Sequence, residues 1–472
     1  MVVKKKRTAE EANLNQDSSP SSEELRELCR LVKSEVVIEL AHLKQLKTLL
    51  KRMSKEEDGE KSVNSIVDTS VLTSLLSSFG ALRTENDNKI YDILERLERK
   101  FKVNLGPLQP LVWGPQAKEH YQKLSSLGSS LHRISSNDVL SYLKPATTWN
   151  TVKNHSRPEQ FDTYNTRFIM QLFAYLLQPG SEVSCPKFIK ENCLSLVFSC
   201  LSSKNEATRV LAYYNLQRFL SLLLELKEER FNEKALFIYV VRLFKQSLPT
   251  SAPRISHLVS HFFARVSKLI LHPEDPVYGQ IVAFLCQKPQ IDLRNVPEFY
   301  KLLLSTSVEY YKQEREWILV LIAEAIIDPF DYAVLQNRSG VKLLLSLFNS
   351  CVLDQPCRKS ILGILKASAK IPSAAYDLVH RCNIHAWIAL TIKNAKLTRW
   401  ERNYLAQIFL ILLNNEKTIR EQKTDRDASA AVGTMTKLAS KTVVSVMREL
   451  LATESEVVSN QRLEEIEAFF QE

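Results

Sequence analysis

Glycine is scarce in this sequence, at 10 of 472 residues, which is about 2% against roughly 7% in ordinary proteins. Tight β-hairpins and loops that wrap phosphate groups rely on glycine, because it adopts positive φ angles at little cost. Helices that are joined by short polar turns have no such need. The composition therefore favours an all-α fold.

Sequence signatures of common enzymes are also absent. The chain has no G-x-x-x-x-G-K-[ST] or G-x-G-x-x-G nucleotide loop, no G-x-S-x-G nucleophile and no H-E-x-x-H zinc motif. We expect a protein that is not an enzyme, has no catalytic residues and binds no cofactor. An enzyme whose site is assembled from distant residues would leave no such pattern, and it remains the third-ranked alternative.

The eight cysteines are scattered and never form a C-x-x-C pair, which is typical of a reduced, intracellular protein. His380, Cys382 and His385 come nearest to a metal cluster. Because zinc normally needs a fourth ligand, we expect packed or surface side chains here and no metal site. The longest apolar run, 317–327, is too short to span a bilayer and contains Glu324.

The net charge of +10 and the pI near 9.0 favour acidic partners such as nucleic acid. A compact basic run near the N-terminus is a candidate nuclear localisation signal, with a solvated tail as the alternative: Lys4, Lys5, Lys6 and Arg7. Two further basic groups are candidate RNA-phosphate contacts, although solvated helix faces explain them about as well. They are Arg242, Lys245, Arg254, Arg265 and Lys268, and then Lys393, Lys396, Arg399 and Arg402.

Composition and patterning divide the chain into six segments. They are a disordered basic and polar tail (1–21), N-terminal helices (22–102), a connector with Gly, Pro and short helices (103–157), a helical-repeat domain (158–414), a charged linker (415–428) and a C-terminal helical segment (429–472). The boundary at the connector depends on five Gly and Pro residues between positions 106 and 115, which no helix interior tolerates.

Apolar periodicity predicts helices within these segments. Ser21 and Glu24 have capping-box spacing ahead of one long helix that reaches Leu46, and a further helix is expected over 88–101. In the repeat domain, four capping residues precede a first-turn proline, at Ser251, Asp275, Asn295 and Asp354. Trp317, Trp387 and Trp400 are expected in the core.

The helix at 206–226 carries apolar residues on more than one face, including Val210 and Tyr214, so it needs more than one neighbour. Stacked pairs of helices meet that need. We therefore predict a degenerate α-solenoid of HEAT-like or armadillo-like helical hairpins, although no fixed period is visible. An irregular globular helical domain is the alternative.

Several long segments resemble one known family. They include Phe168–Ser203, His272–Ser307, REWILVLIAEAI at Arg315–Ile326 and IPSAAYDLVHRCNIHAWI at Ile371–Ile388. Together they resemble the C-terminal domain of the nucleolar pre-ribosomal-associated protein 1 family over 158–414. Members are usually far longer than this chain, so the resemblance leaves the N-terminal stretch unassigned.

The resemblance implies a non-catalytic nucleolar scaffold of helical repeats that acts in early assembly and rRNA maturation of the large (60S) ribosomal subunit. It also implies pre-ribosomal partners, namely a second large helical scaffold and a DEAD-box RNA helicase, with pre-rRNA as a further candidate. No membrane and no small-molecule substrate are expected. The alternative is a helical-repeat adaptor for transport or trafficking with no ribosomal role.

Overall fold

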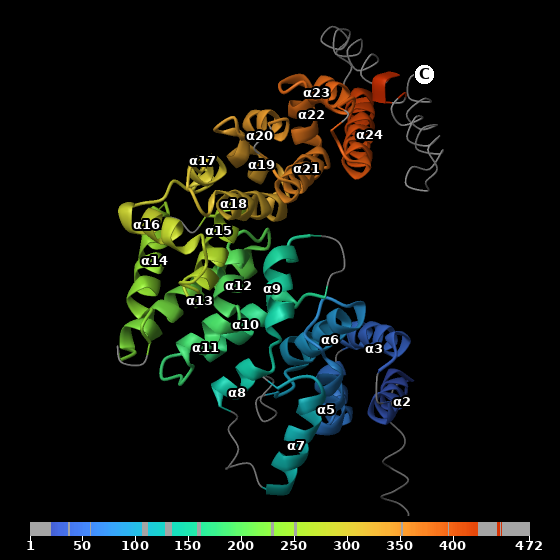
Figure 1. The fold of residues 1–472 in the computed structure, drawn as a ribbon. Coiled ribbons are helices and arrows are strands. Elements are labelled where there is room, and N and C mark those ends of the chain that lie inside the picture. The colour runs from blue at the N-terminus through green and yellow to red at the C-terminus, as the bar shows by residue number, and fades with distance from the viewer. Residues whose placement is uncertain are drawn as a thin grey trace, which may run out of the picture. The chain divides into compact units, whose positions relative to one another are not determined.

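A computed structural model describes residues 20–35, 38–56, 58–105, 112–127, 135–157, 162–227, 231–249, 253–350, 353–394, 396–422, 441–443 and 445 (Figure 1). The chain forms two compact units, unit 1 (Met1–Cys193) and unit 2 (Leu194–Glu472). Within the described ranges the regular structure is helical, apart from one isolated antiparallel bridge between Leu82 and Tyr164. The predicted all-α fold is confirmed.

Unit 1 consists mainly of short helices. Their bounds are α2 (Pro20–Ser34), α3 (Leu40–Met53), α4 (Gly59–Ile66), α5 (Thr69–Ser78), α6 (Glu85–Phe101), α7 (Pro115–Leu127), α8 (Ser136–Ser141), α9 (Pro145–Asn154), α10 (Thr166–Leu176) and α11 (Cys185–Lys190). The helix predicted over 88–101 is α6, and its apolar residues are buried as expected. The single long helix predicted from Ser21 is wrong, because α2 ends at Ser34 and α3 begins at Leu40. Glu35, Ile38 and Glu39, the described residues between the two helices, are not helical.

The Gly- and Pro-containing stretch does not end a unit. Trp113 is only 3% exposed, and its ring meets the Phe168 ring edge to face at 5.3 Å. Phe168 in turn contacts Phe79 at 5.0 Å. Aromatic pairs of this kind add stability beyond the area that they bury. Trp113 and Phe168 are therefore part of the core of unit 1, which extends to Cys193, and the predicted boundary at residues 157 and 158 stays a prediction.

Unit 2 repeats a three-helix pattern after its first helices. Its helices are α12 (Cys193–Cys200, whose first residue is the last of unit 1), α13 (Glu206–Glu225), α14 (Lys234–Ser247), α15 (His257–Leu269), α16 (Tyr278–Gln287), α17 (Phe299–Leu303), α18 (Tyr311–Ala325), α19 (Pro329–Gln336), α20 (Gly340–Phe348), α21 (Gln355–Ala369), α22 (Pro372–His380), α23 (Ile384–Thr391) and α24 (Arg399–Gln422). The helices α18, α21 and α24 begin 44 residues apart, and so do α20 and α23.

The third helix of each repeat packs on the third helix of the next one. Thus α15 contacts α18, α18 contacts α21, and α21 contacts α24 (Figure 1). The predicted solenoid is confirmed, with a repeat of three helices in place of a hairpin. A 44-residue period lies within the range of armadillo and HEAT repeats, about 40 to 47 residues.

A left-handed residue precedes the middle helix of each of the last three repeats. Glu298, Ser339 and Asn383 have φ angles of 54°, 54° and 50°, directly before α17, α20 and α23. Asparagine adopts this conformation readily, whereas glutamate and serine do so at a cost. Because three residue types occupy one structural position, the repeat leaves no sequence signature. This explains why no period was predicted.

The core of unit 2 is rich in phenylalanine. Phe263 of α15 is fully buried, stacks on Phe198 at 5.5 Å and meets Phe244 of α14 edge to face at 4.9 Å. On α13, by contrast, Val210 and Tyr214 are 56% and 45% exposed. Their predicted burial is wrong, because the buried face of α13 lies on the other side of the helix, along Ala212, Leu216, Phe219 and Leu223.

The predicted helix starts have mixed outcomes. Asp354 caps α21 by accepting a hydrogen bond from the Cys357 N–H at 3.1 Å, so this one is confirmed. The helix starts predicted at Asp275 and Asn295 are wrong, and the one predicted at Ser251 is untested. Helices α16 and α17 begin at Tyr278 and Phe299, some residues after the predicted caps, and Ser251 lies outside the described residues.

At the far end of unit 2, α24 continues to Gln422 and so passes the predicted boundary at residues 414 and 415. Of the predicted C-terminal segment, the structure describes only 441–443 and 445. None of the described helices combines the length and the apolarity needed to cross a membrane.

A substitution at Gly340, the first residue of α20, tests how tightly the turn before that helix is packed. A Cβ atom at this position would lie 2.6 Å from the Leu335 carbonyl oxygen, so backbone has to shift. We expect Gly340→Ala to lower the free energy of unfolding by on the order of 1 to 3 kcal/mol. Gly363 of α21 is the control, because its nearest neighbour would be the Ala323 Cβ at 3.8 Å.

In the control, alanine fits the helix and restricts the unfolded chain, so Gly363→Ala should raise stability by about 0.5 to 1 kcal/mol. Urea unfolding followed by circular dichroism measures both variants. Equal shifts in the two variants would contradict the predicted strain at Gly340.

Candidate nucleic-acid interface

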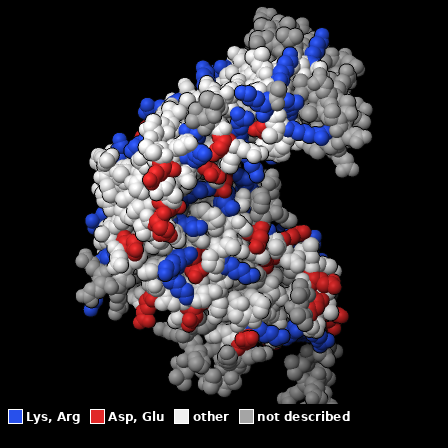
Figure 2. Space-filling model, in the orientation of Figure 1, with Lys and Arg blue, Asp and Glu red and all other residues white. Residues whose placement is uncertain are grey.

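Most of the surplus positive charge lies in the segment that runs from the start of α21 into α24. Between residues 355 and 415 the chain has nine basic side chains and two acidic ones. The basic residues are Arg358, Lys359, Lys366, Lys370, Arg381, Lys393, Lys396, Arg399 and Arg402, and the acidic ones are Asp377 and Glu401. Figure 2 shows Lys and Arg side chains gathered over the α21–α24 part of unit 2, with few acidic side chains among them. We call this set of basic residues the basic face.

Both acids of this segment are turned into the protein. The Asp377 side chain is 14% exposed and accepts hydrogen bonds from the Tyr332 hydroxyl at 2.6 Å and the Gln336 amide at 3.0 Å. Burial, reinforced by this carboxylate, raises the pKa of Tyr332 far above its ordinary value. Asp377 also pairs with Arg381 at 3.4 Å. It therefore offsets little of the charge on the rest of the basic face.

Glu401 is held inside by a capping box. Its side chain is 2% exposed and accepts hydrogen bonds from the N–H and the hydroxyl of Thr398, at 2.7 and 2.9 Å. The Glu401 N–H donates back to the Thr398 hydroxyl at 3.3 Å. This reciprocal pattern starts α24 and satisfies two backbone donors. The remaining carboxylate oxygen lies 3.6 Å from Arg358, so the contacts of Glu401 are made inside the protein.

The turn from α23 to α24 brings the second predicted basic group together. Lys393, Lys396 and Arg399 are exposed. Arg402 is partly buried and donates to the Asn394 carbonyl at 3.1 Å, while the Asn394 side chain accepts from the Lys396 N–H at 3.0 Å. Arg402 thus holds the turn in place, and the other three cations face solvent. Such a surface binds phosphates without reading sequence.

An aromatic side chain lies beside these cations. Trp400 is 39% exposed, and its ring centroid lies 5.1 Å from that of Tyr404 one turn further along α24. The Lys366 ammonium lies 4.7 Å from the centre of the Tyr404 ring. The prediction that Trp400 is a core residue is wrong. Trp317 and Trp387 are half-buried, and their rings contact Phe262 and Phe348 edge to face.

The residues of the first predicted basic group do not form one surface, because three of them are exposed and two are in ion pairs. Arg242 and Lys245 on α14 and Lys268 on α15 are exposed. Arg254 and Arg265 instead form ion pairs with Asp328 and Glu324, and both side chains are largely buried. We therefore correct the prediction for these two arginines, since their charge is already balanced inside the protein. The candidate localisation signal, Lys4–Arg7, lies outside the described residues.

Arg254 belongs to a buried polar network that the sequence did not reveal. Asp331 is fully buried, and it accepts hydrogen bonds from the His257 N–H at 2.7 Å and the Asp328 N–H at 3.0 Å. The Asp331 carboxylate also accepts a hydrogen bond from the Ile327 N–H at 3.1 Å and lies 2.9 Å from His257 Nδ1. Asp328 caps α19 in a capping box with Asp331. Arg254 also donates to the Ser202 carbonyl at 2.8 Å, so the network joins the start of α15 to the start of α19.

The same network is the one group in the described ranges with metal-like spacing, since ligand atoms of His257, Asp328 and Asp331 lie within 4.8 Å of one another. Their oxygens, however, already accept backbone N–H groups and the Arg254 guanidinium. A structural role accounts for the whole arrangement. In the predicted His-Cys-His group, the His380 ring stacks on Tyr376 at 4.0 Å and His385 is buried.

The part of the chain that precedes the exposed cations is similar to known proteins. Residues 194–387 match the model of the family described as nucleolar pre-ribosomal-associated protein 1. The predicted resemblance to this family is confirmed. The human protein of that name is 28% identical over 345 residues, and the mouse protein is 28% identical over 347 residues. Each alignment covers 69% of this chain and 15% of the relative, so the chain spans only a small part of its relatives' length.

The residues of this chain that match the family model, 194–387, contain the buried network and end within α23. The exposed cations of the following turn lie just beyond it. A crystallised engineered protein also aligns, at 16% identity with 95% of this chain and 99% of that chain covered. Its TM-score of 0.29 is too low to indicate a common fold.

We predict that Arg254→Met destabilises unit 2. The change leaves the buried Asp328 carboxylate without its cation, which typically costs about 3 to 5 kcal/mol. Arg242→Met is the control, because Arg242 is exposed, and we expect a change within about 0.5 kcal/mol. Urea unfolding followed by circular dichroism gives both values.

The effect should depend on pH. Burial acts to raise the pKa of Asp328, but the hydrogen bond and charge of Arg254 outweigh it, so the pKa lies below its ordinary value. A lowered pKa contributes stability above the ordinary Asp range, and this stability is lost as the pH falls through the lowered pKa. The difference between wild type and Arg254→Met should therefore shrink in acid. A difference that is the same at neutral and acid pH would contradict this account.

Proposed function

We propose that this chain is a non-catalytic scaffold in ribosome biogenesis, located in the nucleus and nucleolus. In this proposal it acts in early assembly and rRNA maturation of the large (60S) ribosomal subunit. The observation that carries the proposal is the family match over 194–387, supported by relatives whose names are nucleolar and pre-ribosomal. A stacked helical array fits such a role, because it offers long surfaces to several partners at once.

We further propose that the basic face holds pre-rRNA through its phosphates. The exposed cations at the start of α24 supply charge, and Glu401 in the same helical turn is buried. Trp400 supplies an exposed ring on which an unpaired base can stack. The combination fits a single-stranded segment better than a duplex, whose bases are already stacked.

Protein partners belong to the same proposal. A second large helical scaffold and a DEAD-box RNA helicase are the expected neighbours within the pre-ribosomal particle. A scaffold works by raising the local concentration of its partners and by restricting their geometry. Loss of such a protein should stall assembly at one stage and leave single chemical steps intact.

The RNA contact is tested by the salt dependence of binding. Lys393, Lys396 and Arg399 are replaced together by Ala, and Arg402 is kept because it holds the turn. Binding to a fluorescent single-stranded RNA of mixed sequence is measured by anisotropy between low and moderate salt. Each phosphate contact contributes about 0.7 to the slope of log affinity against log salt, so the slope should fall by about 2.

The matched control replaces Lys204, Lys227 and Lys312 by Ala, which removes the same charge from exposed positions of unit 2 outside both candidate groups. It should leave the slope nearly unchanged. Trp400→Ala should weaken binding by about 1 to 3 kcal/mol without altering the slope. An equal loss of slope in the two triple variants would remove the turn as a specific contact.

Depletion of the protein in cells tests the wider function. We expect fewer free large subunits and less mature large-subunit rRNA, while small subunits persist. Sucrose gradients and pre-rRNA analysis measure both effects, and re-expression of the chain is the control. A normal subunit ratio after confirmed depletion, together with a purely cytoplasmic or membrane-associated pool, would instead favour the transport or trafficking adaptor.

A further inference from the structure

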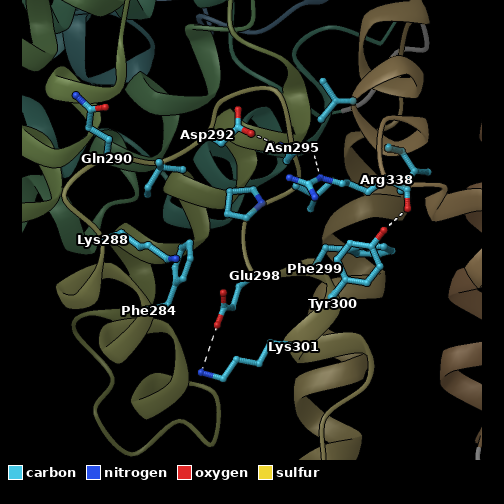
Figure 3. Close-up of a pocket in the computed structure, with 15 residues that line it drawn as sticks. Phe284, Lys288, Gln290, Asp292, Asn295, Glu298, Phe299, Tyr300, Lys301 and Arg338 are labelled. Carbon is cyan, nitrogen blue, oxygen red and sulfur yellow. Dashed lines mark hydrogen bonds and ion pairs between the residues drawn. The ribbon is translucent and has the colours of Figure 1, made fainter.

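Unit 2 contains a pocket of about 460 Å³ between α16, the segment that leads to α17, and the turn from α19 to α20 (Figure 3). Buried apolar side chains form its floor: Phe284, Ile291, Val296, Phe299, Val334 and Leu335. Pockets of about 300 to 1,000 Å³ with apolar walls and a few polar groups are typical binding sites. This one lies between the repeat that ends with α18 and the repeat that ends with α21.

The acids at the pocket rim are already occupied. Asp292 accepts the Arg294 N–H at 2.9 Å and the Asn295 side-chain amide, so it stabilises its own turn. Glu298 pairs with Lys301 at 3.4 Å. The charge of Glu298 is therefore matched by Lys301, and the pocket lining keeps a surplus of one positive charge, because three cations, Lys288, Lys301 and Arg338, face two carboxylates.

Two rim cations remain without an acidic partner among the described residues. Lys288 and Arg338 are exposed and stand on opposite sides of the pocket in Figure 3. Neither of them forms an ion pair with any described residue, and Arg338 has only a 3.3 Å hydrogen bond to the neutral Asn295 side chain. The rim thus offers two positive charges that flank an apolar floor.

Apolar exposure continues from the pocket along the chain. Tyr300 lines the pocket, is 41% exposed and donates its hydroxyl hydrogen to the Arg338 carbonyl. Leu304 follows one turn later and is 48% exposed, while Val308 and Tyr310 in the connection to α18 are 92% and 42% exposed. Large apolar side chains that gather in this way usually mark a contact surface.

We propose that this pocket binds a linear segment of a partner protein that carries a large apolar side chain flanked by Asp or Glu. The apolar side chain enters the pocket and displaces water from its floor. The flanking carboxylates form charge-assisted hydrogen bonds with Lys288 and Arg338. The rest of the segment lies along Tyr300 and Leu304. This inference does not depend on the RNA contact proposed above.

The test is selection from a phage-displayed library of random dodecapeptides on the full chain. Enriched sequences should share an aromatic or aliphatic residue flanked by Asp or Glu. A synthetic peptide of the most enriched sequence is then titrated by fluorescence anisotropy. Lys288→Glu/Arg338→Glu should weaken its binding at least tenfold, and replacement of its apolar residue by Ala should do the same.

The charge-matched control is Lys204→Glu/Lys227→Glu, which reverses two exposed lysines elsewhere in unit 2 and should leave binding unchanged. Circular dichroism melts check that both variants fold. No enrichment, enrichment of sequences that lack acids, or equal binding to both double variants would overturn the proposal. So would competition by single-stranded RNA, or self-association that is abolished by Lys288→Glu/Arg338→Glu, because RNA or a second copy would then be the occupant.

Discussion

The structure of unit 2 depends on burial of one helix in each repeat from two sides. Helix α18 packs on α15 and on α21, and α21 packs on α18 and on α24. A helix in this position has to be apolar on two faces and closely packed, as at Gly363, where α21 approaches Ala323 of α18. The remaining helices of each repeat are then free to carry polar and charged surface. The rim of the apolar pocket is built on such helices and on the turns beside them, whereas the basic face combines residues of α21 and α24 with residues of the neighbouring turns.

Much of this fold follows from the sequence. Scarce glycine, apolar periodicity and a cap such as Asp354 predict the fold class and many helices. The period does not follow, because Glu298, Ser339 and Asn383 share a backbone conformation and not a chemical identity. The break between α2 and α3 was missed because the apolar spacing continues across it. Apolar periodicity indicates which face of a helix is buried, but it does not indicate well at which residue the helix ends.

The sequence predicted which basic residues are candidates for the site, but it did not predict which of them are exposed and which are paired inside the protein. Sequence lists Arg254 and Arg399 as equal cations, yet one is paired with an aspartate 74 residues away and the other is exposed. Glu401 likewise looks as if it neutralises its neighbours until its inward hydrogen bonds are known. Pairing over such distances depends on which helices stack, and no local pattern records it. The exposure of Trp400 was hidden for the same reason.

The stacking of α15, α18, α21 and α24 also shapes how unit 2 responds to damage. When each repeat touches mainly the one before and the one after, stability is close to a sum of neighbour terms. A lesion then weakens its own repeat and two interfaces, while repeats further along keep their contacts. Unfolding can therefore start in one repeat and proceed to the neighbouring repeats one after another. The network around Arg254 joins positions more than one helix apart, so a lesion there weakens contacts beyond a single repeat.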